Sequence, residues 1–230
     1  MKDWKIFESE ANGLSLIGDN RYGRYLCEGS YLQMWHLYII IDELYEIKVY
    51  GKFDVKDKIV IDVGSYYGES ACYFFQRGAS KVICYEPFNS GSFIMMNCRL
   101  NGFNNVDVYR NPITGVHEKV HIFQGAPNYG GTTLENYSNP NAPEVQALSL
   151  EDIAVQDSIL KMDCEGYEFR SFKEASKETI RKFSAIMIEY HKDKGEVSEL
   201  KAKLEESVFK VEYDDHYPNT GMLYAERLPE

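Results

Sequence analysis

The sequence predicts an α/β protein in which helices cover both faces of a mostly parallel sheet, and three observations lead to this fold class. A β-branched run at residues 59–61 suits a strand buried on both faces. A glycine turn follows, and then apolar residues at helical spacing over 70–75. Further strand and helix patterns alternate along the chain, and two strands at its end form an antiparallel pair that would close the sheet.

The composition excludes several classes of protein. The chain has 230 residues, 44% of them hydrophobic and 27% charged, which is ordinary for a soluble globular protein. No apolar run is long enough for a membrane span, and the N-terminus lacks the apolar core of a signal peptide. A net charge of −11 argues against a nucleic-acid partner. Five cysteines without a C-x-x-C pair indicate a reduced, cytoplasmic setting.

The first 50 residues predict an N-terminal extension that packs on or caps a catalytic domain at 51–230. Short strands are expected at 4–7 and 14–17, around an Asn-Gly turn. Residues 33–49 carry apolar side chains largely at helical spacing, with acidic residues between them, and predict an amphipathic helix. This helix could cover the ligand mouth as a lid, and plain packing against the sheet is the alternative.

The turn after the first central strand has the pattern D-x-G-x-x-x-G, formed by Asp62, Gly64 and Gly68. Gly64 would let a ligand approach the backbone, and the following helix points free N–H groups at the same place. A carboxylate here repels phosphate, so a cationic or uncharged polar ligand fits better. The dinucleotide and phosphate-loop fingerprints are absent. An ordinary turn of some other α/β protein is the alternative.

The second strand, at 81–85, ends in Glu86, followed by Pro87 and Phe88. An acidic residue at this position of a nucleoside-binding α/β fold accepts hydrogen bonds from both ribose hydroxyls. Phe88 could flank the adenine. A helix at 90–100 and a third strand at 106–109 follow, and Asn111 then lies where it could read the adenine amino group.

The middle of the chain predicts a hairpin with a long polar loop. Strands are expected at 120–123 and 145–148, on either side of a turn-rich segment at 125–142. Such a loop beside the ligand mouth could be a substrate flap, and a solvent loop without a role is the alternative.

Two later strands end in ionisable residues. The fourth, at 158–162, precedes Asp163, Glu165 and Glu168. The fifth, at 185–188, precedes Glu189 and His191. Carboxyl ends of parallel strands hold the ligands of α/β sheets, so we expect these side chains in the site. A helix at 196–207 and strands at 208–213 and 221–225 complete the fold.

Four motifs together resemble the FkbM family of S-adenosylmethionine (SAM) methyltransferases. They are I-D-V-G at 61–64, Y-E-P at 85–87, L-K-M-D-C-E-G-Y-E at 160–168 and I-E-Y-H at 188–191. The resemblance covers about residues 40–191 and weakens towards both ends. It implies the three-layer, Rossmann-like class I fold, a mostly parallel seven-stranded sheet with an antiparallel C-terminal strand. It also implies SAM as cofactor and O-methylation of a hydroxyl on a small molecule, sugar or lipid.

With SAM as the ligand, we expect contacts from the turns after the first four strands. They are Asp62, Gly64, Ser65, Tyr66, Gly68, Glu69, Ser70, Glu86, Pro87, Phe88, Asn111 and Asp163. The bulky Tyr66 and its neighbour depart from the usual family pattern, which leaves the substrate open. An RNA methyltransferase and a SAM-binding protein without catalysis are the alternatives.

The expected catalytic residues are His191, Asp163 and Glu165. His191 is the first candidate for the general base, because the unperturbed pKa of histidine lies near neutrality. Glu165 is the second candidate. We expect no metal, although Asp163, Glu165 and Glu189 could hold a divalent ion in a metal-assisted variant of the reaction.

Overall fold

The computed structural model describes residues 5–9, 14–19, 22–28, 31–122, 143–215 and 217–229. Its centre is a seven-stranded sheet in the order β11-β12-β10-β9-β4-β5-β6. The bounds, in chain order, are β4 Ile59–Val63, β5 Lys81–Tyr85, β6 Val106–Tyr109, β9 Ile159–Met162, β10 Ala185–His191, β11 Phe209–Asp214 and β12 Thr220–Arg227.

Six strands of this sheet run in the same direction, and β12, between β10 and β11, runs against them. β4 pairs with β5 on one side and with β9 on the other, so Val63 lies between Tyr85 and Met162. β12 pairs antiparallel with both β10 and β11. The predicted class I sheet and its C-terminal antiparallel pair are therefore confirmed. Because the strands end in register, the residues that follow them meet at one edge.

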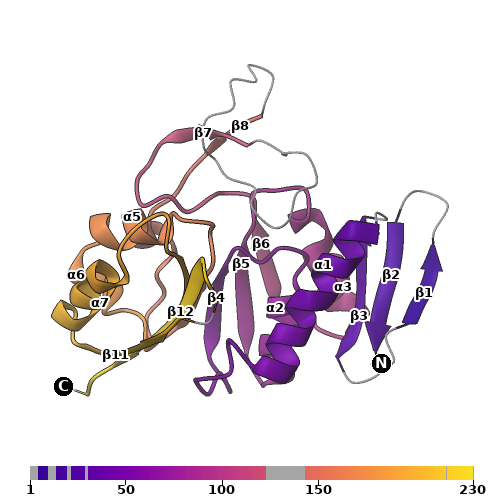
Figure 1. The fold of residues 1–230 in the computed structure, drawn as a ribbon, viewed down its shortest axis with the longest axis horizontal. Helices are drawn as coiled ribbons and strands as arrows, with labels where there is room; N and C mark the ends of the chain where they lie inside the picture. Colours follow the sequence, from indigo (N-terminus) through magenta and orange to yellow (C-terminus); the bar gives the residue numbers. More distant parts are fainter. Residues whose placement is uncertain are drawn as a thin grey trace.

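Helices cover both faces of the sheet (Figure 1). One face carries α2 Glu69–Gln76 and α3 Gly91–Leu100, and the other carries α4 Leu150–Ile153, α5 Glu168–Glu174, α6 Lys177–Ile180 and α7 Val197–Glu206. Two hydrophobic clusters correspond to these faces, with Val60 in one and Ile61 in the other. Successive residues of a strand point to opposite faces, so one buried strand supplies both cores. No described helix has the length and apolar character needed to cross a membrane.

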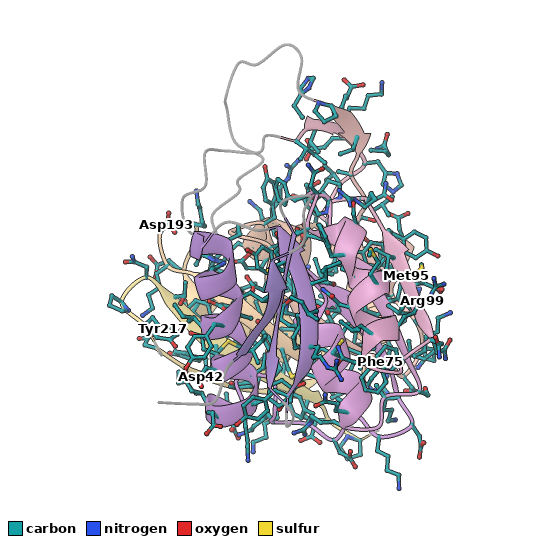
Figure 2. All side chains as sticks on the ribbon, turned by 90° about the vertical axis from the view of Figure 1, so that its right-hand side faces the viewer. Asp42, Phe75, Met95, Arg99, Asp193 and Tyr217 are labelled. Carbon is teal, nitrogen blue, oxygen red and sulfur yellow. The ribbon has the colours of Figure 1, made fainter. Side chains whose placement is uncertain are left out.

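The N-terminal segment forms a separate antiparallel sheet of β1 Lys5–Ser9, β2 Leu14–Asp19 and β3 Gly23–Glu28. The sequence analysis predicted β1 and β2 but did not predict β3. Side chains of α3 bind this sheet, because Asn97 exchanges hydrogen bonds with the backbone of Leu26, and Asn101 with that of Arg24. Figure 2 looks onto this side, with α3, marked by Met95 and Arg99, beside the N-terminal strands.

The predicted helix at 33–49 is present in two parts. α1 Tyr31–Asp42 continues into a π-helical turn, η1 Glu43–Ile47, which ends at Lys48 with a left-handed φ of 64°. Leu37, Ile41 and Leu44 are fully buried in the same core as α2 and α3. These three side chains thus pack in the core, and the role of the helix as a lid stays a prediction.

The predicted hairpin is formed by β7 Lys119–His121 and β8 Glu144–Gln146, which pair antiparallel. Both strands are shorter than expected. The predicted flap loop at 125–142 lies outside the described residues.

Candidate functional site

The carboxyl ends of β4, β5, β9 and β10 bring the predicted residues to one edge of the sheet. The β4 turn lies against the β9 end, since Asp163 donates its N–H to the carbonyl of Val63 at 3.0 Å. Gly64 donates likewise to the carbonyl of Tyr85 at 2.9 Å. These backbone bonds join the turns after the three strands into one surface.

Gly64 is needed here for a reason that the sequence did not indicate. Its φ is +77°, and a Cβ at this position would lie 1.7 Å from the carbonyl oxygen of Asp163. The residue must therefore be glycine because the β9 end approaches the turn so closely. Gly68, with φ of +87°, allows a similar approach of Ile94 on α3.

Asp62 supports the turn from beneath. Its side chain is fully buried, Oδ2 accepts a hydrogen bond from Oγ of Ser70 at 2.7 Å, and Oδ1 accepts none. Ser65, also buried, donates to the main-chain carbonyl of Asp62 at 2.7 Å. The direct contact expected between Asp62 and a ligand stays a prediction, because the carboxylate is not exposed in this structure.

Lys161 is a buried charged residue at this edge that the site prediction omitted. Its side chain is 2% exposed, and Nζ donates to the carbonyl of Gly64 at 2.7 Å. The same nitrogen lies 3.3 Å from Oδ1 of Asp62 and 3.9 Å from Oδ2 of Asp163, under the ring of Tyr50. Burial lowers the pKa of Lys161, but these carboxylates raise it above its usual value, so the ammonium stays charged. A lysine inside an otherwise apolar strand was the available signal.

Glu86 is held by the two turns beside it. The N–H groups of Tyr66 and Phe88 each donate to one of its carboxylate oxygens at 2.9 Å. The side chain is 4% exposed, and burial raises its pKa to about 7. Pro87 and Phe88 are half-buried at the surface, and the amide of Asn111 donates to the carbonyl of Gln146 on β8.

Glu69 is buried beside the β4 turn, and its expected contact with the cofactor stays a prediction. It is 3% exposed, Oε2 accepts the N–H of Tyr67 at 3.0 Å, and burial raises its pKa to about 8. The group is therefore largely neutral at pH 7, which reduces the charge of this acidic edge.

His191 lies between two carboxylates from the turn after β9. Its Nε2 is 3.2 Å from Oε2 of Glu165, and its Nδ1 is 2.8 Å from Oε1 of Glu168. Burial lowers the pKa of His191, but the hydrogen bonds and charges of these glutamates outweigh it and raise the pKa to about 11. This value lies well above the unperturbed one on which the choice of His191 as general base rested, and its catalytic role stays a prediction. Glu168, fully buried, is a partner that the motif contained but the site prediction omitted.

Two further carboxyl groups have raised pKa values at this edge. Burial raises the pKa of Asp163 to about 6, against the charge of Lys161, and that of Glu189 to about 8. One ligand atom from each of Asp163, Glu165 and His191 lies within 4.8 Å of the others, a spacing that suits a metal ion. The sequence analysis named Asp163, Glu165 and Glu189 as possible metal ligands. In this structure His191, and not Glu189, forms the group with Asp163 and Glu165.

Comparison with known proteins agrees with this architecture. The model of the methyltransferase FkbM domain matches residues 62–213. No curated protein matches the chain significantly. Among solved structures, TYW2 from M. jannaschii in complex with AdoMet is similar with a TM-score of 0.53 and 13% identity, over 97% of this chain and 90% of that one. Magnesium protoporphyrin IX methyltransferase from Synechocystis has a TM-score of 0.50 and 11% identity, over 86% and 85%. At these identities the structures show the fold alone.

Proposed function

This chain belongs to the FkbM family of SAM-dependent methyltransferases, and from that premise we propose that it methylates a hydroxyl group of a small molecule, sugar or lipid. The observation that carries the proposal is the acidic edge where β4, β5, β9 and β10 end. Glu86, our candidate for the ribose, follows β5 at this edge, and the cluster of Asp163, Glu165 and His191 lies at the ends of β9 and β10.

The side chains at this edge suit SAM as a ligand. SAM carries a positive charge and a ribose. The edge where β4, β5, β9 and β10 end offers carboxylates, whereas a phosphate ligand would need positively charged side chains. The second lone pairs of the Glu86 oxygens suit the ribose hydroxyls. The exposed parts of Asp163 and Glu165, 27% and 34% of their side chains, would face the positive charges. Asn111 stays our candidate beside the adenine.

The chemistry follows from these positions. When bound, SAM supplies an electrophilic methyl group, so the protein must align an acceptor oxygen, exclude water and accept the hydroxyl proton. Asp163 and Glu165 would orient the acceptor from the β9 side. His191, protonated between Glu165 and Glu168, would fix the direction of the Glu165 carboxylate and balance part of its charge.

A binding and a transfer experiment test this function together. Calorimetry should detect SAM and S-adenosylhomocysteine (SAH), and NAD should not bind. Transfer from methyl-labelled SAM is then compared between bulk tRNA and the small-molecule fraction of a cell extract. Label in a hydroxyl of a small molecule supports the proposal, and base treatment should leave this ether label in place. Label in tRNA would make the chain an RNA methyltransferase, and binding without transfer would make it a SAM-binding protein.

A further inference from the structure

His36 on α1 lies against the cofactor turn. Its Nδ1 is 3.2 Å from the hydroxyl oxygen of Tyr66, and the two rings meet edge to face with centroids 5.4 Å apart. Tyr66 belongs to the turn after β4 and donates its N–H to Glu86. Tyr66 therefore lies between His36 and Glu86, the residue proposed to bind the ribose.

The second ring nitrogen of His36, Nε2, makes no hydrogen bond or ion pair with any residue that the structure describes. Among the described residues, Glu165, from the turn after β9, is the acidic group that raises the pKa of His36. His36 is half-buried, and burial lowers its pKa while Glu165 opposes the shift. The pKa of His36 is thus shifted in the opposite direction to that of His191, which is raised.

His36 thus contacts the β4 turn through Tyr66 and lies within electrostatic range of Glu165 in the β9 turn. We propose that Nε2 of His36 accepts the proton of the acceptor hydroxyl, an inference that rests on the proposed O-methylation. The acceptor oxygen forms a bond to the methyl carbon, and the electron pair of the broken sulfur–carbon bond stays on sulfur. The hydroxyl proton passes to Nε2 and then to solvent.

In this step Tyr66 is the hydrogen-bond partner of Nδ1 of His36. When Nδ1–H donates to the hydroxyl oxygen of Tyr66, the lone pair is on Nε2. Burial keeps the pKa of Tyr66 well above its usual value, so the residue remains a neutral phenol, whose oxygen is able to accept this hydrogen bond. Tyr66 is accordingly a positioning residue, and its loss should weaken the base without removing it.

Variants of these residues test the inference in the full chain. The substrate source is the small-molecule fraction of a cell extract with methyl-labelled SAM. His36→Gln should lower transfer about 10²–10⁴-fold and remove the acid limb of the pH profile, while SAH affinity by calorimetry stays within about twofold. Tyr66→Phe should lower transfer less. His117→Gln, which changes an exposed histidine paired with Asp152, is the matched control and should change neither quantity.

An NMR titration gives a readout that needs no substrate. The His36 resonance, identified by its loss in His36→Gln, should titrate below pH 6.5 in the wild-type protein. A pKa above 7 would overturn the inference, and so would full transfer by His36→Gln. A parallel loss of SAH affinity would overturn it too, since His36 would then serve cofactor binding. If the wild-type protein binds SAH but labels no hydroxyl compound, the proposed function itself fails.

Discussion

Nζ of Lys161 on β9 donates a 2.7 Å hydrogen bond to the carbonyl oxygen of Gly64 in the turn after β4. This one side chain therefore links the turn after β4 to β9, the strand that precedes Asp163. It also supplies the positive charge that buried Asp62 needs, at 3.3 Å. The geometry of the cofactor side and that of the acceptor side thus depend on the same buried ammonium.

The first prediction concerns this ammonium. Lys161→Met should lower the free energy of unfolding by about 3–5 kcal/mol, because Asp62 stays buried without its counter-charge. The double variant with Asp62→Asn should recover part of the loss. Denaturant unfolding measures both. Lys177→Met, at an exposed ion pair with Glu206, is the control and should change stability by less than about 0.5 kcal/mol. A Lys161→Met protein as stable as the control would contradict this role.

The second prediction concerns the ribose. Glu86→Ala should weaken SAM binding by about 1–3 kcal/mol, through loss of a charged hydrogen-bond acceptor. Calorimetry with SAM and SAH measures the change, and Glu199→Ala on the exposed face of α7 is the control. Because Glu86 also accepts two backbone N–H groups, the unfolding temperature must be followed as well. Unchanged affinity in a folded Glu86→Ala protein would remove this residue from the site.

The third prediction concerns pH. Burial raises the pKa of Glu69 and of Glu189 to about 8 and that of Glu86 to about 7, above the values near 4.5 of the unfolded chain. Between pH 5 and 8 the folded chain therefore holds more protons, and the stability of the ligand-free protein should fall as pH rises. The raised pKa of His191 acts in the same direction above pH 6.5. Thermal unfolding at pH 5, 6.5 and 8 measures this trend, and a rise in stability would refute it.

SAM affinity should follow the opposite trend. The cationic cofactor favours ionised carboxyl groups, and Asp163, whose pKa burial raises to about 6, and Glu86 lose their protons as pH rises. Affinity should accordingly increase from pH 5.5 to 8 in calorimetry. The Glu86→Ala protein should show a weaker dependence, and an affinity independent of pH in the wild type would count against both carboxylates.

The fifth prediction concerns metals. We expect transfer to be unchanged after a chelator is added, because the ring nitrogens of His191 are already held by Glu165 and Glu168. The test compares methyl transfer in the presence of a chelator with methyl transfer in the presence of added Mg²⁺. Loss with chelator and recovery with Mg²⁺ would mean that a cation enters between Asp163, Glu165 and His191.

The sequence by itself determined the architecture and the edge of the sheet that forms the site. The buried strand at 59–63, the glycine turn after it and the paired strands at the end of the chain are local patterns, and each predicted its element. The carboxyl ends of parallel strands lie at the same edge of a sheet. The positions of Asp62, Glu86 and Asp163 along the chain therefore predicted that all three lie at this edge.

Only the tertiary structure decided how these residues act on one another. The pKa of His191 depends on Glu165 and Glu168, and the place of Lys161 depends on the turn of another strand, 97 residues away. His36 and Tyr66 are 30 residues apart and meet because α1 packs over the β4 turn. Such pairings depend on three-dimensional packing and burial, which no local pattern in the sequence contains.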